Sequence, residues 1–100
     1  MIIAEFAIFP TSEGSSVSKY VKKAIEAIKS TGLNYEIGAM STVIEGKNID
    51  EIFDAVKKAY DAIISMGAKR IHIDLRIDHR LDKEETMDYK KRAINERNMG

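Results

Sequence analysis

The segment from Arg70 to Arg80 alternates between apolar and ionisable residues, and this pattern constrains the fold more than any other in the chain. Successive side chains of a β-strand point to opposite faces of a sheet, so the alternation predicts a strand with one buried and one polar face. An ordinary solvated strand has the same pattern, so the polar face is only a candidate for function. The predicted buried side chains are Ile71, Ile73, Leu75 and Ile77, and the ionisable ones are Arg70, His72, Asp74, Arg76 and Asp78.

Composition limits the classes of protein to which the chain can belong. Its 100 residues are enough for one domain around one core, which we expect to span residues 1–100. Lys plus Arg and Asp plus Glu number 16 each, so the chain lacks the positive charge that favours nucleic-acid binding. The absence of cysteine excludes disulfides, thiolate metal sites and a cysteine nucleophile, and favours a cytoplasmic location. The apolar start, Met1–Pro10, is too short to span a membrane and lacks a basic leader, so we expect a buried strand there.

Hydrophobic periodicity predicts the remaining elements of secondary structure. Apolar residues recur at helical spacing after the polar loop 11–16 and again after Asn48. Ser15 or Ser16 can cap the first helix and Asn48 the second, while Gly32 and Gly67 are suited to end them. The predicted order is a strand over 2–9, a helix over 17–28, a hairpin of strands 34–38 and 42–45, a helix over 49–66, the strand 70–78, and a weaker helix from Met87.

This order is typical of an α+β, ferredoxin-like βαββαβ fold, with an antiparallel four-stranded sheet, two helices on one face and an extra C-terminal helix. The second face of such a sheet is open. In the first strand that face would carry either Ile3, Ala7 and Phe9 or Ile2, Ala4, Phe6 and Ile8, so it is mostly apolar in either case. Because an exposed apolar patch usually marks an association surface, we expect a homo-oligomer. The alternative is that the terminal helix covers this face within one chain.

The candidate catalytic and metal-binding groups form no recognisable constellation. His72 and His79 are separated by an odd number of residues, so a regular strand places them on opposite faces and a two-histidine metal site is not expected. Several strands carry carboxylates, but their spacing does not show that any two of them meet, and ion pairs with Arg70, Arg76 and Arg80 are the simpler interpretation. We therefore predict neither catalytic residues nor a bound metal or cofactor.

The turn from Ser41 to Gly46 combines two hydroxyls, a carboxylate and a glycine at the start of an inner strand. Thr42 and Glu45 are three residues apart and should point to opposite faces. A single pocket could use both only through a β-bulge or across a subunit interface.

At these residues the chain resembles the small thiamine-binding protein family. The resemblance extends from Met1 to about Ile94 and rests on four features, which are fairly specific only in combination. They are the first strand ending in Pro10, the segment Ser16–Val21, the segment Met40–Gly46, and Arg70–Asp78 followed by Arg80. The chain departs from the family pattern at Ser41, where the family commonly has Gly, at Asp74, where it has Thr, and at His79, where it has a second Asp. These departures bear on which ligand the pocket prefers.

The resemblance implies a domain that assembles through its sheets into dimers and often tetramers. It also implies binding of thiamine or its hydroxymethylpyrimidine part, without catalysis, and we expect the ligand to bind near a subunit interface. Carboxylates, small hydroxyls and an apolar or sulfur-containing wall suit an aminopyrimidine and a thiazolium cation. Phe9 or Met40 would pack on a ring. The candidate ligand-binding residues are Met40, Ser41, Thr42, Glu45 and Asp74, with Ser18 and Glu5 as weaker additions.

Three other functions are compatible with this fold. Acylphosphatase-like hydrolysis needs an arginine near the loop after the first strand, but Arg70 is the first arginine in the chain. RNA binding on an open sheet needs exposed aromatic side chains, yet Phe6 and Phe9 fall on opposite faces. A structural or regulatory assembly unit without thiamine binding is the remaining alternative.

Overall fold

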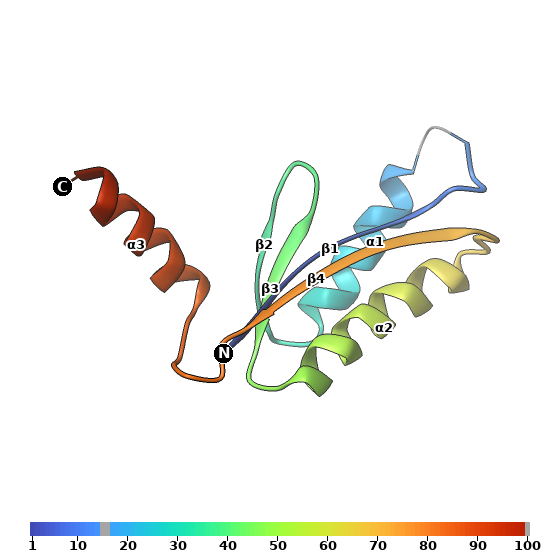
Figure 1. Ribbon diagram of the computed structural model, residues 1–100. Helices are drawn as coiled ribbons and strands as arrows, with labels where there is room; N and C mark the ends of the chain where they lie inside the picture. The colour runs from blue at the N-terminus through green and yellow to red at the C-terminus, as the bar shows by residue number, and fades with distance from the viewer. Residues whose placement is uncertain (15–16, 100) are drawn as a thin grey trace.

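The computed structural model describes residues 1–14 and 17–99 and has the predicted element order. The strands lie in the order β2-β3-β1-β4, and each neighbouring pair is antiparallel. Helices α1 and α2 cover one face of this sheet (Figure 1). The α+β, ferredoxin-like prediction is therefore confirmed. The elements are β1 (Ile2–Pro10), α1 (Ser18–Lys29), β2 (Asn34–Ile37), β3 (Thr42–Gly46), α2 (Ile49–Ser65), β4 (Ile71–His79) and α3 (Met87–Met99).

The pairing of β1 with β4 decides which side chains share a face. It continues without interruption from Ile2 opposite His79 to Pro10 opposite Ile71. Even-numbered residues of β1 point toward the helices, and they lie beside the odd-numbered residues of β4. The predicted apolar side of the last strand is thus confirmed as the helix-facing side.

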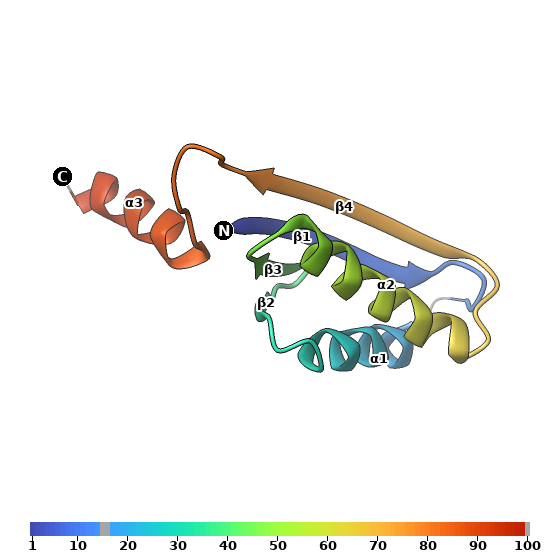
Figure 2. The same ribbon diagram turned by 90° about the horizontal axis from the view of Figure 1, so that it is seen from below.

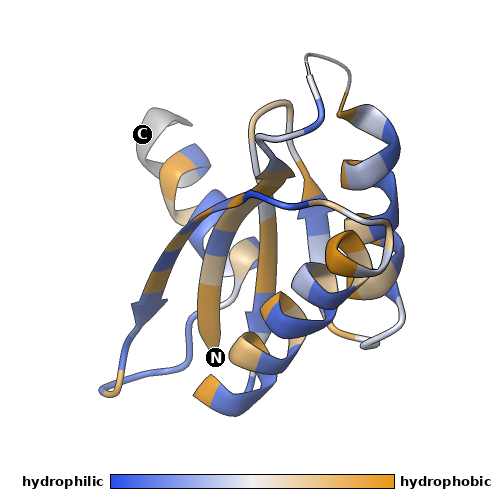
Figure 3. Cartoon of the chain, turned by 90° about the vertical axis from the view of Figure 1, so that its right-hand side faces the viewer, coloured by the Kyte–Doolittle hydropathy of each residue, from blue (hydrophilic) through white to orange (hydrophobic). Residues whose placement is uncertain are grey.

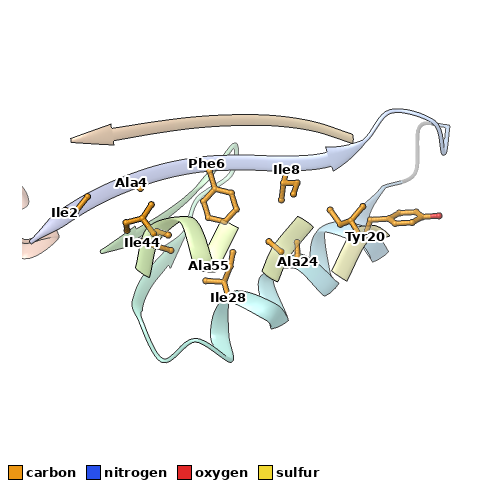
Figure 4. Close-up of a cluster of buried hydrophobic side chains, with 12 residues drawn as sticks. Ile2, Ala4, Phe6, Ile8, Tyr20, Ala24, Ile28, Ile44 and Ala55 are labelled. Carbon is orange, nitrogen blue, oxygen red and sulfur yellow. The ribbon is translucent and has the colours of Figure 1, made fainter. Parts of the chain in front are cut away.

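The core lies between the sheet and the two helices (Figure 4). Phe6 at its centre is 2% exposed, and Ile44 from β3 is fully buried beside it. Removing such a side chain from water stabilises the fold by about 1.5–3 kcal/mol. Orange, apolar segments of the strands and helices face each other in this layer (Figure 3). The helices contribute Tyr20, Ala24, Ile28, Ile52, Ala55, Ala59 and Ile63 to it.

The helix ends follow the local sequence. The Asn48 side chain accepts a hydrogen bond from the backbone N–H of Glu51 at 2.9 Å, so the predicted cap of α2 is confirmed. Gly32 and Gly67 follow the two helices with φ of 77° and 93°, a left-handed backbone that glycine adopts without strain. Helix α1 starts after Val17 without a side-chain cap, and the predicted caps Ser15 and Ser16 lie outside the described residues.

Helix α3 stands on the side of the sheet opposite α1 and α2 and points away from it (Figure 1). Its first turns touch the sheet: Met87 is buried, and the ammonium groups of Lys90 and Lys91 pair with Asp78 and Glu36. The radius of gyration is 15.0 Å, against roughly 13 Å for a compact domain of this length. Within one chain, α3 therefore covers only one end of the open face. Among the described helices, none combines the length and apolarity that crossing a lipid bilayer requires.

Candidate functional site

The open face of the sheet carries the candidate site. Strand register places Ile3, Glu5, Ala7 and Phe9 of β1 on this face, and all four remain partly exposed. On β4 the ionisable even-numbered residues lie beside them. The face is therefore an apolar strip bordered by charge, as the alternation in the last strand predicted.

A hollow of about 390 Å³ opens on this face beside the β2–β3 turn. Glu5 lines it, and the Ser41 hydroxyl donates a hydrogen bond to Glu5 Oε2 at 2.9 Å. The Arg76 guanidinium lies 3.6 Å from Glu5 Oε1. The rest of the lining is Phe6, Ala7, Met40, Asp74 and Leu75. Two strands and one turn thus bring two carboxylates, a hydroxyl, a guanidinium and a thioether into one concavity.

A second, shallower hollow of about 340 Å³ continues from the first toward the N-terminal end of β1. Its walls include Ile3 and Val43, and it shares Glu5 and Arg76 with its neighbour. The two hollows together extend along β1 between β3 and β4.

A smaller hollow of about 190 Å³ lies on the other side of the sheet, between α1 and the β2–β3 turn. Thr42 lines it, because this residue pairs with Phe6 on the helix-facing side. Met40 and Ser41 line both this hollow and the one around Glu5. The turn therefore separates an apolar hollow from a polar one.

The structure distributes the predicted ligand-binding residues over several places. Glu5, Met40, Ser41 and Asp74 meet in the open-face hollow. Thr42 lines the helix-side hollow. Phe9 also contributes to that lining, while its ring lies 5.1 Å from the His72 ring. Ser18 lines a separate, open groove along α1. Among the predicted residues that the structure describes, carboxylates and a hydroxyl come together only in the open-face hollow, in the group Glu5, Met40, Ser41 and Asp74.

Glu45 lies outside these hollows and is only 8% exposed. The Asn34 side-chain amide donates to its Oε1 at 2.8 Å, and the backbone N–H of Met87 donates to its Oε2 at 2.9 Å. Both carboxylate oxygens of Glu45 thus accept hydrogen bonds from other segments of the chain. The negative charge of Glu45 lies at the N-terminus of α3, where the helix dipole favours an anion. In this arrangement Glu45 anchors α3 to the sheet.

Arg76 is a site residue that the sequence interpretation treated only as an ion-pair partner. The alternation in β4 already placed it on the same face as Asp74. What the sequence could not supply was the register that sets Arg76 opposite Glu5. With both strand positions known, the cluster follows directly.

The histidines behave as their odd spacing predicted. His72 pairs with Phe9 and His79 with Ile2, so the two point to opposite faces of β4. The Nε2 atom of His72 lies 3.1 Å from Asp74 Oδ2. Within residues 1–14 and 17–99, no group of three or more histidine or acidic side chains is arranged to hold a metal ion.

The open-face hollow contains groups that suit a small molecule with positive charge and hydrogen-bond donors. The carboxylates of Glu5 and Asp74 are acceptors for such groups, and charge-assisted hydrogen bonds are stronger than neutral ones. Met40, 89% exposed at the rim, offers a flexible and polarisable surface for an aromatic ring.

Comparison with known proteins places the chain in a family. The family model for "Thiamine-binding protein" matches residues 4–95. The UPF0045 protein MJ1052 of Methanocaldococcus jannaschii is 46% identical over 95% of this chain and 93% of its own length, and its crystal structure superposes with a TM-score of 0.86 over 95% of this chain and 96% of that one. A UPF0045 protein of Methanothermobacter thermautotrophicus is 37% identical over 97% of this chain and 99% of its own.

A crystal structure from Thermotoga maritima, whose description names thiamine biosynthesis or salvage, is 29% identical, with a TM-score of 0.79 over 93% of this chain and 97% of that one. The matches cover nearly the whole chain, including the β2–β3 turn and β4. This chain belongs to the thiamine-binding protein family.

Proposed function

We propose that this protein binds thiamine or its hydroxymethylpyrimidine part reversibly, without catalysing a reaction, in the open-face hollow. The observation that carries the proposal is the grouping of Glu5, Ser41 and Asp74 beside Met40 in one concavity of a family member. Its volume, about 390 Å³, falls within the range of about 300–1,000 Å³ that small-molecule sites occupy.

The chemistry of the two ligand rings matches the two sides of this hollow. An exocyclic amine on a pyrimidine is a hydrogen-bond donor that a carboxylate such as Glu5 can accept. A thiazolium ring carries a permanent positive charge, which the Asp74 carboxylate attracts. Met40 can pack on either ring, since a thioether makes favourable contacts with aromatic groups. Asp74 gives this hollow a second carboxylate beside that of Glu5.

We also propose that the open face associates with a second copy of the chain and so encloses the hollow. The apolar strip of Ile3, Ala7, Phe9 and Val43 is only partly buried, and α3 covers just one end of the face. Exposed apolar strips of this kind are characteristic of association surfaces. A dimer or tetramer formed this way would place the ligand near a subunit boundary.

Isothermal titration of the purified protein with thiamine and with hydroxymethylpyrimidine tests the ligand. The wild-type chain should give saturable heat with at least one of them. Glu5→Gln and Asp74→Asn each replace a charged acceptor with a neutral one, and each should weaken binding about tenfold to a hundredfold. The matched control is Glu36→Gln, because Glu36 lies on the same face but pairs with Lys91 away from the hollow.

Two results would contradict the assignment. Equal losses in Glu36→Gln and Glu5→Gln would mean that general charge, and not this hollow, attracts the ligand. No heat with either compound at millimolar concentration, in a chain that still forms its oligomer, would favour a structural or regulatory assembly unit instead.

A further inference from the structure

Helix α3 contacts the second, shallower hollow of the open face through a charged side chain. Asp78 lines this hollow together with Ile3, Val43 and Ile77. The Asp78 carboxylate accepts a hydrogen bond from the Lys90 ammonium, which belongs to the first half of α3. A cation supplied by the chain itself therefore occupies an acceptor in the wall of the hollow.

Strand pairing and helix spacing together explain how α3 reaches this wall. Ile3 lies opposite Glu45 of β3 and opposite Asp78 of β4, so the three residues form one row across the sheet. Glu45 accepts the backbone N–H of Met87, which places the start of α3 over this row, at the end of the sheet where β1 begins (Figure 2). Lys90 follows Met87 by three residues and lies on the same side of the helix. Its ammonium is therefore within reach of Asp78.

The two open-face hollows form one groove with a carboxylate toward each end. Glu5 and Arg76 line both hollows, whereas Asp74 lines the first and Asp78 the second. Four residues of extended strand separate Asp74 from Asp78, which corresponds to about 13 Å between their Cα atoms. Glu5 lies between them on the neighbouring strand. A two-ring ligand whose amine is held by Glu5 can thus direct its cationic ring toward either end of the groove.

The lining of the second hollow suits an aromatic cation. Its branched aliphatic side chains can bury the apolar surface of a flat ring, while the carboxylate of Asp78 meets the positive charge. The Lys90 and Asp78 side chains are 37% and 52% exposed, and ion pairs exposed to this extent contribute little to stability. A ligand can therefore displace the Lys90 ammonium at small cost.

On the basis of the function proposed above, we propose that Asp78 is a second acceptor for the cationic ring of the ligand, and that Lys90 of α3 occupies this acceptor until the ligand displaces it. The exchange replaces one cation by another, so the carboxylate keeps a positive partner. Helix α3 stays attached meanwhile, because Glu45 and the Lys91–Glu36 pair hold it through contacts of their own. The ligand and Lys90 thus compete for Asp78, and each weakens the binding of the other.

This competition distinguishes between the two candidate ligands. Thiamine carries a permanent positive charge on its thiazolium ring and therefore competes with the Lys90 ammonium. Hydroxymethylpyrimidine lacks that ring, so it can occupy the first hollow without displacing Lys90. A change at Lys90 should therefore alter the affinity for thiamine and leave the affinity for hydroxymethylpyrimidine as it is.

Titration calorimetry of the full-length Lys90→Met variant with both compounds tests the competition. Freeing Asp78 should raise the affinity for thiamine about twofold to fivefold, the size expected for an exposed ion pair. Lys91→Met is the matched control, because it removes the same charge from the neighbouring residue, whose partner Glu36 lies on β2, one strand beyond the hollow. It should bind thiamine as the wild type does. Circular dichroism confirms that each variant is folded.

A double-mutant cycle assigns the gain to Asp78. In a chain that carries Asp78→Asn, adding Lys90→Met should no longer raise the affinity for thiamine, because a neutral amide attracts neither the ammonium nor the thiazolium ring. A gain that persists in Asp78→Asn, or an equal gain in Lys91→Met, would mean that net charge and not this acceptor governs binding, and it would overturn the proposal.

The outcomes for this inference and for the proposed function can be told apart. If the wild type binds both compounds and Lys90→Met binds thiamine no more tightly, the proposed function stands and the role of Lys90 and Asp78 is wrong. If neither compound gives heat with the wild type or with Lys90→Met, both proposals are overturned.

Discussion

The two faces of strand β1 have similar composition but differ in burial. Even-numbered residues such as Ile2 and Phe6 are buried by α1 and α2, whereas odd-numbered residues such as Ile3 and Phe9 are partly exposed. Both sets are mostly apolar. The difference shows that hydrophobicity identifies a surface that needs covering but does not say what covers it. One face is completed by helices of the same chain, and the other holds the hollows and the charges.

The sharpest test compares two phenylalanines of this one strand. Phe6→Ala removes a core side chain, and we expect it to lower the free energy of unfolding by about 3–5 kcal/mol. Phe9→Ala removes the same atoms from the open face, and the loss should be at most about half as large at low protein concentration. Urea denaturation followed by circular dichroism measures both.

Protein concentration separates the contributions of folding and association. If the open face associates, the cost of Phe9→Ala should grow as the concentration of the oligomer rises, since subunit binding adds to stability. The cost of Phe6→Ala should change little. Equal costs for the two variants at every concentration would mean that both faces are packed alike, and the comparison would fail.

A second test concerns the one buried carboxylate of the open face. Glu45→Ala leaves the buried Met87 N–H without its acceptor, and an unsatisfied buried donor costs about 1–3 kcal/mol, whereas the exposed Asn34 amide can bind water. We expect a loss of that size, with faster hydrogen exchange at the Met87 amide. Glu36→Ala is the control, because an exposed ion pair contributes only about 0–1 kcal/mol. Unchanged exchange at Met87 would show that α3 does not depend on Glu45.

The order of strands and helices was predictable because each sequence pattern that indicates it involves residues close together in the chain. Alternation in β4, helical spacing after Asn48 and the glycines after each helix depend on residues close together in sequence. The same parity rule correctly placed Thr42 and Glu45 on opposite faces. It also separated the two histidines.

The grouping of side chains at the site was less predictable because it depends on register. Glu5, Ser41 and Asp74 come from three parts of the chain, and only the pairing of β1 with β3 and β4 brings them together. Glu45 was grouped with Ser41 because the two are near in sequence. Its actual partner, Met87, is 42 residues away, and no local pattern connects them. The sequence therefore named half of the lining of the hollow without showing which residues meet.

The smallest expected effect concerns the border between the open face and α3. The Lys90 ammonium, through its hydrogen bond and its charge, lowers the pKa of the Asp78 carboxyl below the ordinary value of 3.8. A lowered pKa means that the ionised form favours the folded contact. Its contribution is complete above pH 3.8 and is lost as the pH falls through the lowered pKa. Acid should therefore loosen α3 from the sheet while the helix-covered core, which contains no ionised group, is unaffected by this titration.

Carboxyl ¹³C chemical shifts of Asp78 followed between pH 2 and pH 6 measure this pKa. In Lys90→Met it should return toward 3.8, because both the hydrogen bond and the nearby charge are removed. Lys91→Met is the matched control, since Lys91 pairs with Glu36 on β2 and should leave Asp78 unchanged. If Lys90→Met had no effect, α3 would be held by the Met87–Glu45 hydrogen bond and the Lys91–Glu36 ion pair without a contribution from Lys90. Helix α3 would then cover the open face less firmly than the structure indicates. That result would favour a second copy of the chain as the partner of this face.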